Sequence, residues 1–161
     1  MIYFTSLIFT LLLAHIARAV PACDDVASPQ VAYDDTEQLV LNTYKVTFDS
    51  VYDRPEGSTD SVACSNGPHG LASKYPHFKN FPDFPYLGGA FDVKWGSPNC
   101  GKCWKLTDKK SKRFIYFAAI DHTASGFNIG KKAFIALGGS VAAGSLEAEA
   151  IKVADHFCGF K

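Results

Sequence analysis

The sequence predicts a small, mainly β domain, a barrel or sandwich with one or two short helices, and three observations lead to that class. From residue 46 onward, short segments alternate apolar and polar residues with the period of a strand. All 13 glycines lie after residue 56, where they divide those segments. The chain has 161 residues, of which 47% are hydrophobic and 14% aromatic, so it can bury one core.

The first 19 residues have the features of a signal peptide. Ile2 to Leu13 is almost entirely apolar, and Ala17-Arg18-Ala19 places small residues at the two positions that a signal peptidase reads. The alternative is a membrane anchor, but this run falls short of the roughly 20 residues that span a bilayer. We therefore expect no transmembrane segment and a secreted, extracellular protein that can associate with a cell wall.

Residues 20–44 are predicted to be an acidic N-terminal extension, and residues 45–161 the folded domain. The extension contains five acidic residues and no basic one. From Lys45 onward there are 15 basic and 11 acidic residues, so the domain carries +4 although the whole chain is neutral. This balance does not indicate nucleic-acid binding. The alternative is that Gln38 to Phe48 already forms the first strand of the domain.

The strand pattern recurs along the domain, and each predicted strand rests on apolar alternation or β-branched and aromatic content. The segments are Val46–Phe48, Val51–Tyr52, Ala90–Trp95, Trp104–Thr107 and Arg113–Asp121. The last two flank a turn at residues 108–112, which predicts a hairpin. Leu146 to Ala154 is compatible with either a helix or a strand.

One helix is predicted over residues 129–137, because Ile129, Ala133, Phe134 and Leu137 recur at helical spacing. Asn128 is a candidate cap before it, and two glycines follow it. A second short helix is predicted at Gly70 to Tyr75, ended by Pro76.

Secretion decides how the five cysteines are interpreted. The Cys100-x2-Cys103 spacing also occurs in redox dithiols and zinc sites. The redox motif needs a helix after it, whereas Trp104 to Thr107 alternates like a strand, and no second ligand pair for zinc is present. We therefore expect structural disulfides, and no metal or cofactor.

Five blocks of residues, in order and spacing, resemble the cerato-platanin family over about residues 46–159. They are Ser61–Leu71, Phe84–Gly89, Cys100–Thr107, Ile120–His122 with Ser125–Ile129, and Cys158. The resemblance implies a six-stranded double-psi β-barrel, as in the first domain of expansins, from a secreted fungal protein.

The resemblance also implies two disulfides, Cys64–Cys100 and Cys103–Cys158. Cys23 has no counterpart in the family: it is removed by processing, remains free or links two chains. One departure from the family pattern is Phe48, which stands where a tyrosine is usual, so any hydrogen bond from that hydroxyl is lost.

For function, the resemblance implies binding of chitin or other cell-wall oligosaccharides, expansin-like loosening of a wall without hydrolysis, self-association at surfaces, and a defence-eliciting role in virulence. The expected function is therefore that of a non-catalytic carbohydrate-binding protein. The alternative is a surface-active elicitor that acts on a membrane or a host plant receptor, with incidental sugar binding.

The candidate carbohydrate-binding residues are Asp121, Asn128, Asn66 and His69. Asp121 ends the most apolar strand and corresponds to the acidic residue in the groove of the expansin-like barrel; otherwise it accepts hydrogen bonds from backbone N–H groups of the next turn. Asn128 could instead cap the helix, and His69 could be an ordinary solvated loop residue.

Two further questions stay open at the level of sequence. Trp95 and Trp104 could both stack on sugar, although alternation favours the core for Trp104. The aromatics of residues 75–86 either cover one end of the barrel or form an apolar patch.

Glycoside hydrolysis usually needs a second carboxylate within about 10 Å of the first. Asp49, Asp53 and Asp92 are each better explained as turn or strand-edge residues, so we expect no enzyme.

Overall fold

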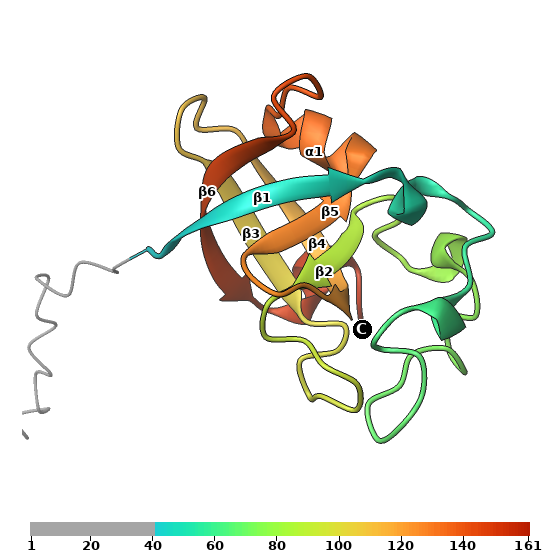
Figure 1. Ribbon diagram of the computed structural model, residues 1–161. Helices are drawn as coiled ribbons and strands as arrows, with labels where there is room; N and C mark the ends of the chain where they lie inside the picture. Colours follow the sequence, from blue (N-terminus) through green and yellow to red (C-terminus); the bar gives the residue numbers. More distant parts are fainter. Residues whose placement is uncertain (1–40) are drawn as a thin grey trace, which may run out of the picture. The chain divides into compact units, whose positions relative to one another are not determined.

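A computed structural model of the protein describes residues 41–161, in which six strands form a closed barrel (Figure 1). The strands are β1 (Thr43–Asp49), β2 (Leu87–Ala90), β3 (Cys103–Asp108), β4 (Phe114–His122), β5 (Phe127–Gly130) and β6 (Ser145–Val153). One α-helix, α1 (Lys131–Leu137), and four short 3-10 helices complete the described part, the latter at Ser50–Asp53, Thr59–Ser61, Phe78–Asn80 and Asp155–Cys158. The predicted signal peptide, residues 20–40 of the extension and Cys23 lie outside the described residues.

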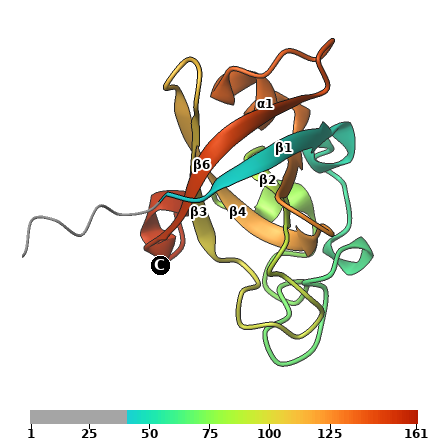
Figure 2. The same ribbon diagram turned by 60° about the vertical axis from the view of Figure 1, so that its left-hand side comes forward.

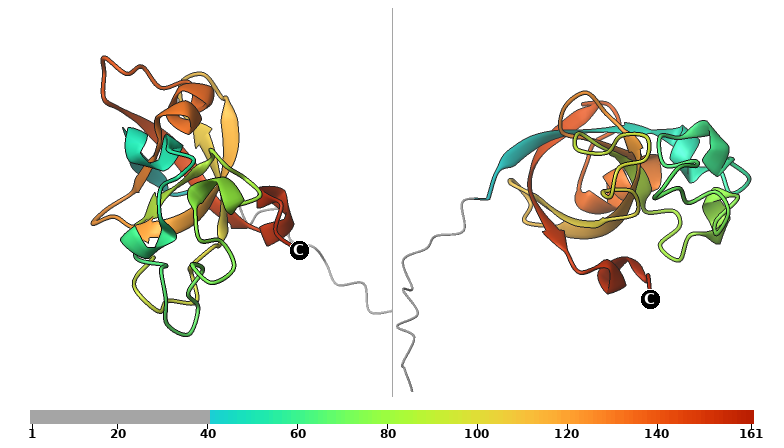
Figure 3. Two further views of the ribbon diagram at one scale, coloured as in Figure 1. Left: turned by 90° about the vertical axis from the view of Figure 1, so that its right-hand side faces the viewer. Right: turned by 90° about the horizontal axis from the view of Figure 1, so that it is seen from below.

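Around the barrel the strands run in the order β1-β5-β2-β4-β3-β6, which closes on itself. The pairs β1–β5 and β2–β4 are parallel, and the other four are antiparallel. The view from below in Figure 3 shows the strands as a ring, with the loops of residues 50–85 on one side of it. The predicted six-stranded β-barrel is therefore confirmed.

The interior of the barrel is filled by alternate side chains of every strand, because successive residues of a strand point to opposite faces. Val46, Leu106, Phe117 and Ile129 are fully buried there. Trp104, expected in the core, is 6% exposed, and its ring centroid lies 5.0 Å from that of Phe127 in an edge-to-face contact.

α1 lies at one end of the barrel (Figure 2), where it contacts β1 and β4. Its residue Phe134 packs on Phe48 with 4.9 Å between ring centroids. The helix begins after Gly130, later than the sequence suggests, since Asn128 belongs to β5. The backbone N–H of Lys132, in the first turn of α1, donates a hydrogen bond to the carboxylate of Asp53. Asp53 therefore has the capping role that was expected of Asn128.

A second apolar cluster lies outside the barrel, between its wall and the loops of residues 50–85. Tyr52, Phe78 and Phe81 are buried against Leu87 of β2 and Ile120 of β4. The aromatics of residues 75–86 were expected to cover one end of the barrel or to form an apolar patch, but Phe78 and Phe81 are buried against its outer wall. Burial of this cluster fixes the loops against the strands that carry the candidate site.

Three predicted elements differ from the structure. Val51 and Tyr52 lie in a 3-10 helix, because the side chain of Asp49 accepts a hydrogen bond from the N–H of Val51 and turns the chain. The strand predicted over residues 90–95 ends at Ala90, and the chain turns there. Residues 70–75 form turns, not a helix.

The ambiguous segment at the C-terminal end of the chain is a strand, β6, and it pairs with both β1 and β3. Strand β1 begins at Thr43, two residues before the predicted start of the domain. Together β1 and β6 close the barrel.

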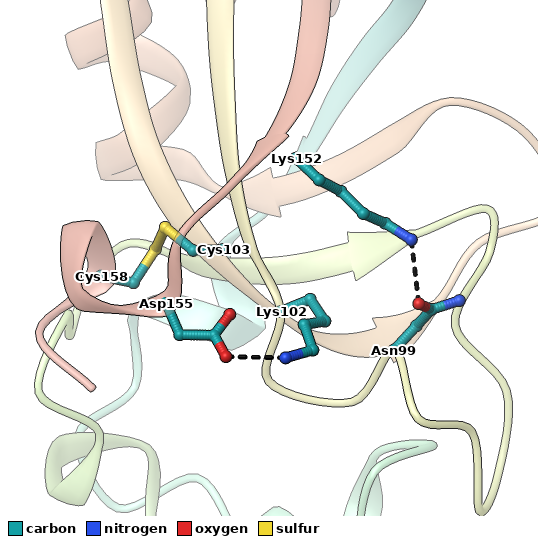
Figure 4. Close-up of polar contacts among 6 residues, drawn as sticks. All are labelled: Asn99, Lys102, Cys103, Lys152, Asp155 and Cys158. Carbon is teal, nitrogen blue, oxygen red and sulfur yellow. Dashed lines mark hydrogen bonds and ion pairs between the residues drawn. A yellow bond between two sulfur atoms is a disulfide. The ribbon is translucent and has the colours of Figure 1, made fainter. Parts of the chain in front are cut away.

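Both disulfides implied by the family resemblance are present, Cys64–Cys100 and Cys103–Cys158. The second joins β3 to the C-terminal 3-10 helix, as Figure 4 shows. Beside it, the ammonium of Lys102 donates to the carboxylate of Asp155 over 2.7 Å. The C-terminal segment is thus held to the barrel by a covalent bond and an ion pair.

Asp83, in the loops outside the barrel, makes stability depend on pH. Burial raises the pKa of Asp83 to about 7, and its Oδ2 atom has no hydrogen-bond partner among the described residues. The unfolded chain loses this proton near pH 4 and the folded chain only near pH 7, so stability falls as pH rises between those values.

We therefore expect Asp83→Asn to stabilise the protein at pH 8 by on the order of 1–2 kcal/mol, a figure reduced for solvent screening of a half-buried group, and to have little effect at pH 3.5. Urea denaturation of both proteins at the two pH values measures this. An equal effect of the substitution at both would contradict the role of the carboxylate.

Candidate functional site

Asp121 and Asn128, two of the four predicted site residues, lie in one row across the outer face of the barrel. Gly89 of β2 pairs with Asp121 of β4 on one side and with Asn128 of β5 on the other. The register of β2 and β4 shifts between Gly88 and Gly89, and the Asp121 carboxylate reaches the loops outside the barrel, where it is bonded to Tyr52 and Ala63. Asn128 also points outward, because its neighbours in β5 are buried in the core. Neighbouring strands lie about 4.8 Å apart. The backbones of the two polar residues are therefore about 10 Å apart across the sheet, with no side chain between them, because Gly89 has none.

The carboxylate of Asp121 is held by three donors from three parts of the chain. Its Oδ2 accepts a hydrogen bond from the Tyr52 hydroxyl at 2.9 Å, and its Oδ1 accepts from the backbone N–H groups of Ala63 at 2.9 Å and His122 at 2.8 Å. Burial, reinforced by the charge of Asp121, raises the pKa of Tyr52 well above its usual range, so the phenol remains a donor.

Through these hydrogen bonds, Asp121 connects the barrel to the loops outside it. The bond to His122 is the structural role that the sequence left open, while the bonds to Tyr52 and Ala63 reach 69 and 58 residues along the chain. The side chain is only partly buried, so the carboxylate is also within reach of a ligand.

Asn128 continues the row toward β1. Its Oδ1 accepts a hydrogen bond from the hydroxyl of Thr47 at 3.1 Å, and Thr47 is its register partner on β1. This leaves the amide Nδ2 of Asn128 to donate. The row therefore presents a carboxylate at one end and an amide at the other, the two groups that recognise sugar hydroxyl and acetamido groups.

Asn66 and His69 lie in the loop that follows Ala63, on the loop side of Asp121. The Oδ1 of Asn66 accepts a hydrogen bond from the indole Nε1 of Trp95 at 2.7 Å. Asn66 also lines a polar pocket of about 420 Å³, together with Asp60, Ser65, Gly67, Gly70, Ala72 and Ser73. His69 is exposed and does not line this pocket. The structure thus joins Asp121 and Asn128 in one row and places the other two candidates on an adjacent loop.

Another pocket, of about 630 Å³, lies elsewhere and contains none of the four candidates. Lys45, Lys109 and Lys110 line it together with Asp108, Ser145, Leu146 and Glu147. Its lining mixes lysine and carboxylate side chains of opposite charge, so neither its size nor its charge identifies a ligand. We therefore place the candidate site by side-chain arrangement rather than by cavity volume.

Sequence reasoning missed Tyr52, Thr47 and Gly89. Tyr52 was assigned to a strand, and its bond to Asp121 joins residues too far apart in sequence for a local pattern to reveal. Thr47 and Gly89 acquire their roles only through strand register, which depends on how the barrel closes. The two adjacent glycines at 88 and 89 were the single available signal, since Gly88 lies against the backbone of Asn128 and Ile129, where a Cβ would approach to 2.6 Å.

The three carboxylates considered as partners for hydrolysis each have a structural bond. Asp49 caps the 3-10 helix after β1, Asp53 binds the first turn of α1, and Asp92 pairs with Lys152. Lys152 also donates to the side chain of Asn99 at 2.9 Å (Figure 4). Within residues 41–161, no group of three or more metal-ligating side chains comes together, and no helix is long and apolar enough to cross a membrane.

The closed barrel, its two disulfides and the polar row on its outer face define a small, disulfide-bonded β-barrel protein with a surface suited to a polar ligand. Comparison with known families agrees with this class: the cerato-platanin family profile matches residues 44–160. The chain belongs to the cerato-platanin family.

Individual relatives support the same assignment. The chain is 40% identical over 126 residues to the heat-stable 19 kDa antigen of Coccidioides immitis, covering 76% of this chain and 85% of the antigen. It is 41% identical over 103 residues to cerato-platanin of Ceratocystis fimbriata f. sp. platani, covering 63% of this chain and 75% of the relative. The crystal structure of cerato-platanin 2 from M. perniciosa matches with a TM-score of 0.69 at 36% identity, covering 74% of this chain and all of that one.

Proposed function

We propose that the protein is a secreted, non-catalytic carbohydrate-binding protein that binds chitin or related cell-wall oligosaccharides at the row formed by Asp121, Gly89 and Asn128. The observation that carries the proposal is the register of β4, β2 and β5, which sets a carboxylate and an amide on one face across a glycine. The carboxylate suits sugar hydroxyls, and the amide suits hydroxyl or acetamido groups. Two disulfides support secretion, because they persist in oxidising compartments.

The hydrogen bonds of Asp121 support a non-catalytic role in this proposal. All of its hydrogen bonds are accepted from donors, whereas a glycosidase acid must carry and donate a proton. The other candidate carboxylates are engaged in structure. We further propose an expansin-like action, in which the protein loosens contacts between polymer chains by binding them without cleavage.

The test is the effect of Asp121→Asn and Asn128→Ala on binding of the N-acetylglucosamine hexamer, measured by titration calorimetry. We expect each change to weaken binding about tenfold, the loss that follows when a charge-assisted or amide hydrogen bond to a ligand is removed. Asparagine at 121 keeps an oxygen for the N–H groups of Ala63 and His122, so the fold is preserved, whereas alanine would leave three donors unpaired.

Glu147→Gln is the matched control, because Glu147 is an exposed acid on β6 that lines the 630 Å³ pocket, away from the proposed site. Its affinity for the hexamer should equal that of the unaltered protein. Thermal unfolding of all four proteins must show one cooperative transition. Equal affinity of the Asp121 and Asn128 variants with the unaltered protein would remove this row from the site.

A second candidate function is a surface-active elicitor that acts on a membrane or a host plant receptor, and one observation favours it. Phe114 and Phe157 are 53% and 47% exposed, and Tyr116 contacts both rings, at 5.8 and 4.9 Å between centroids. One matching solved structure is that of "the fungal elicitor Cerato-Platanin", at 38% identity and a TM-score of 0.65. Full potency of the Asp121→Asn/Asn128→Ala double variant in a plant-response assay, at concentrations where it no longer binds the hexamer, would favour this function.

A further inference from the structure

Trp95 is an exposed aromatic side chain held in a fixed orientation. It is 65% exposed, yet its indole Nε1 donates to Asn66 at 2.7 Å. The ring lies over Gly67, where an added Cβ would come within 3.2 Å of an indole carbon. One edge of the ring is thus bonded and part of its surface is packed, while most of the indole faces solvent.

The backbone around Trp95 is fixed by one contact before this residue and by a turn that contains it. Lys94 to Ser97 forms a turn, closed by the bond from the N–H of Ser97 to the carbonyl of Lys94 at 3.0 Å, with Gly96 at a φ of +70°. Just before the turn, the carbonyl of Val93 contacts the imidazole Nδ1 of His122 at 2.6 Å. Since its surroundings are already ordered, a ligand that uses the indole face pays little ordering entropy.

Polar groups surround the indole on the side of the loop that contains Asn66. Because the Oδ1 of Asn66 is engaged by Trp95, the amide Nδ2 of Asn66 is left to donate to a ligand. The 420 Å³ pocket beside it adds the side chains of Asp60, Ser65 and Ser73. A flat aromatic face next to amide, hydroxyl and carboxylate groups matches a sugar ring, which has an apolar face and polar edges.

We propose that Trp95 is a stacking platform for one ring of the bound oligosaccharide and that Asn66 and the adjoining pocket bind the polar edge of that ring. The proposal rests on the proposed carbohydrate-binding function and extends its site. The chain from Ala63 to Asn66 connects the two parts: Ala63 donates to Asp121, and Asn66 accepts from Trp95. The three residue steps between them span at most about 11 Å, so a single oligosaccharide can contact both.

Three other aromatic side chains in residues 41–161 do not share this arrangement. Trp104 is buried in the barrel. Phe114 and Phe157 pack on Tyr116, and a phenylalanine ring has no N–H group that could fix its orientation by a hydrogen bond. The contrast between the two tryptophans also provides the test. Trp104 is 6% exposed and Trp95 is 65% exposed, so a soluble ligand that changes tryptophan fluorescence does so through Trp95.

The experiment titrates the secreted protein with the N-acetylglucosamine hexamer and, separately, with cellohexaose, and follows tryptophan fluorescence and calorimetric heat together. We expect the ligand that binds to change the fluorescence, and Trp95→Ala to lose about tenfold or more in affinity. Trp95→Phe keeps a ring but loses the bond to Asn66, so its affinity should fall between the two. Because Trp95 is exposed, the substitutions leave the core intact, and thermal unfolding checks this.

The outcomes separate the two proposals. Unchanged affinity of Trp95→Ala together with weakened binding by Asp121→Asn would overturn the role of Trp95 and leave the proposed function standing. A fluorescence change and a Trp95-dependent affinity with cellohexaose alone would overturn chitin as the ligand and support stacking. No fluorescence change with either hexamer would overturn the stacking platform.

Discussion

Removing the disulfide between Cys103 and Cys158 should destabilise the protein by about 4 kcal/mol, as expected in the chain-entropy model for a bond that spans 55 residues. Both cysteines are buried, so alanine is the appropriate replacement, since serine would bury an unpaired hydroxyl. Urea denaturation of Cys103→Ala/Cys158→Ala against the unaltered protein gives the free energy of unfolding.

Cys64→Ala/Cys100→Ala is the matched variant, because its bond spans 36 residues and has nearly the same predicted entropy. The two variants should differ in which segment loses protection against hydrogen exchange. Without the second disulfide, the C-terminal helix Asp155–Cys158 is held by the partly exposed, weak ion pair between Lys102 and Asp155 and by the stacking of Phe157 on Tyr116. Hydrogen exchange should therefore rise in residues 155–161 of the first variant only. Unchanged exchange there would show that packing alone holds this segment.

Gly126→Ala should cost about 3 kcal/mol or more, because two separate penalties act at that position. The residue has a φ of +58°, and a side chain there costs roughly 1–2 kcal/mol. A Cβ would also lie 2.1 Å from the backbone carbonyl oxygen of Lys45, which cannot move without shifting β1. The parallel pairing of β1 with β5 begins next to this contact, at Val46 and Phe127.

Gly144→Ala is the control for the first penalty. Gly144 has a φ of +72° but nothing within 4 Å of an added Cβ, so alanine should cost only the conformational term of about 1 kcal/mol. The difference between the two variants in chemical denaturation isolates the contact with Lys45. If both lose the same stability, the close approach of β1 to residue 126 is not a constraint on the fold.

The barrel was largely predictable because its strands carry local signals. Arg113 to Asp121 alternates clearly, and β4 covers nearly the same residues. Where a side chain redirected the backbone, the local pattern failed. Asp49 ends β1 by capping the next turn, so Val51 and Tyr52, which have strand-forming side chains, lie in a 3-10 helix. A competing side-chain hydrogen bond outweighs intrinsic propensity there.

The candidate site could be predicted only residue by residue. Asp121 was found because it ends an apolar strand and matches a family motif, but its bond to Tyr52 requires the folded loops. The row of Asp121, Gly89 and Asn128 exists because β2 lies between β4 and β5, an arrangement that no local pattern specifies. Trp95 was predicted to be in a strand, whereas the turn at Gly96 brings it to the surface.

The position of β1 also limits how far proteolytic trimming can proceed from the N-terminal side. β1 pairs with β5 on one side and β6 on the other, so a protease that cuts before Thr43 leaves every strand pair in place. A cut within β1 would expose the backbone of both neighbours as unpaired edges, which invite aggregation. All six strand pairs of the described part, residues 41–161, therefore lie on the C-terminal side of residue 42.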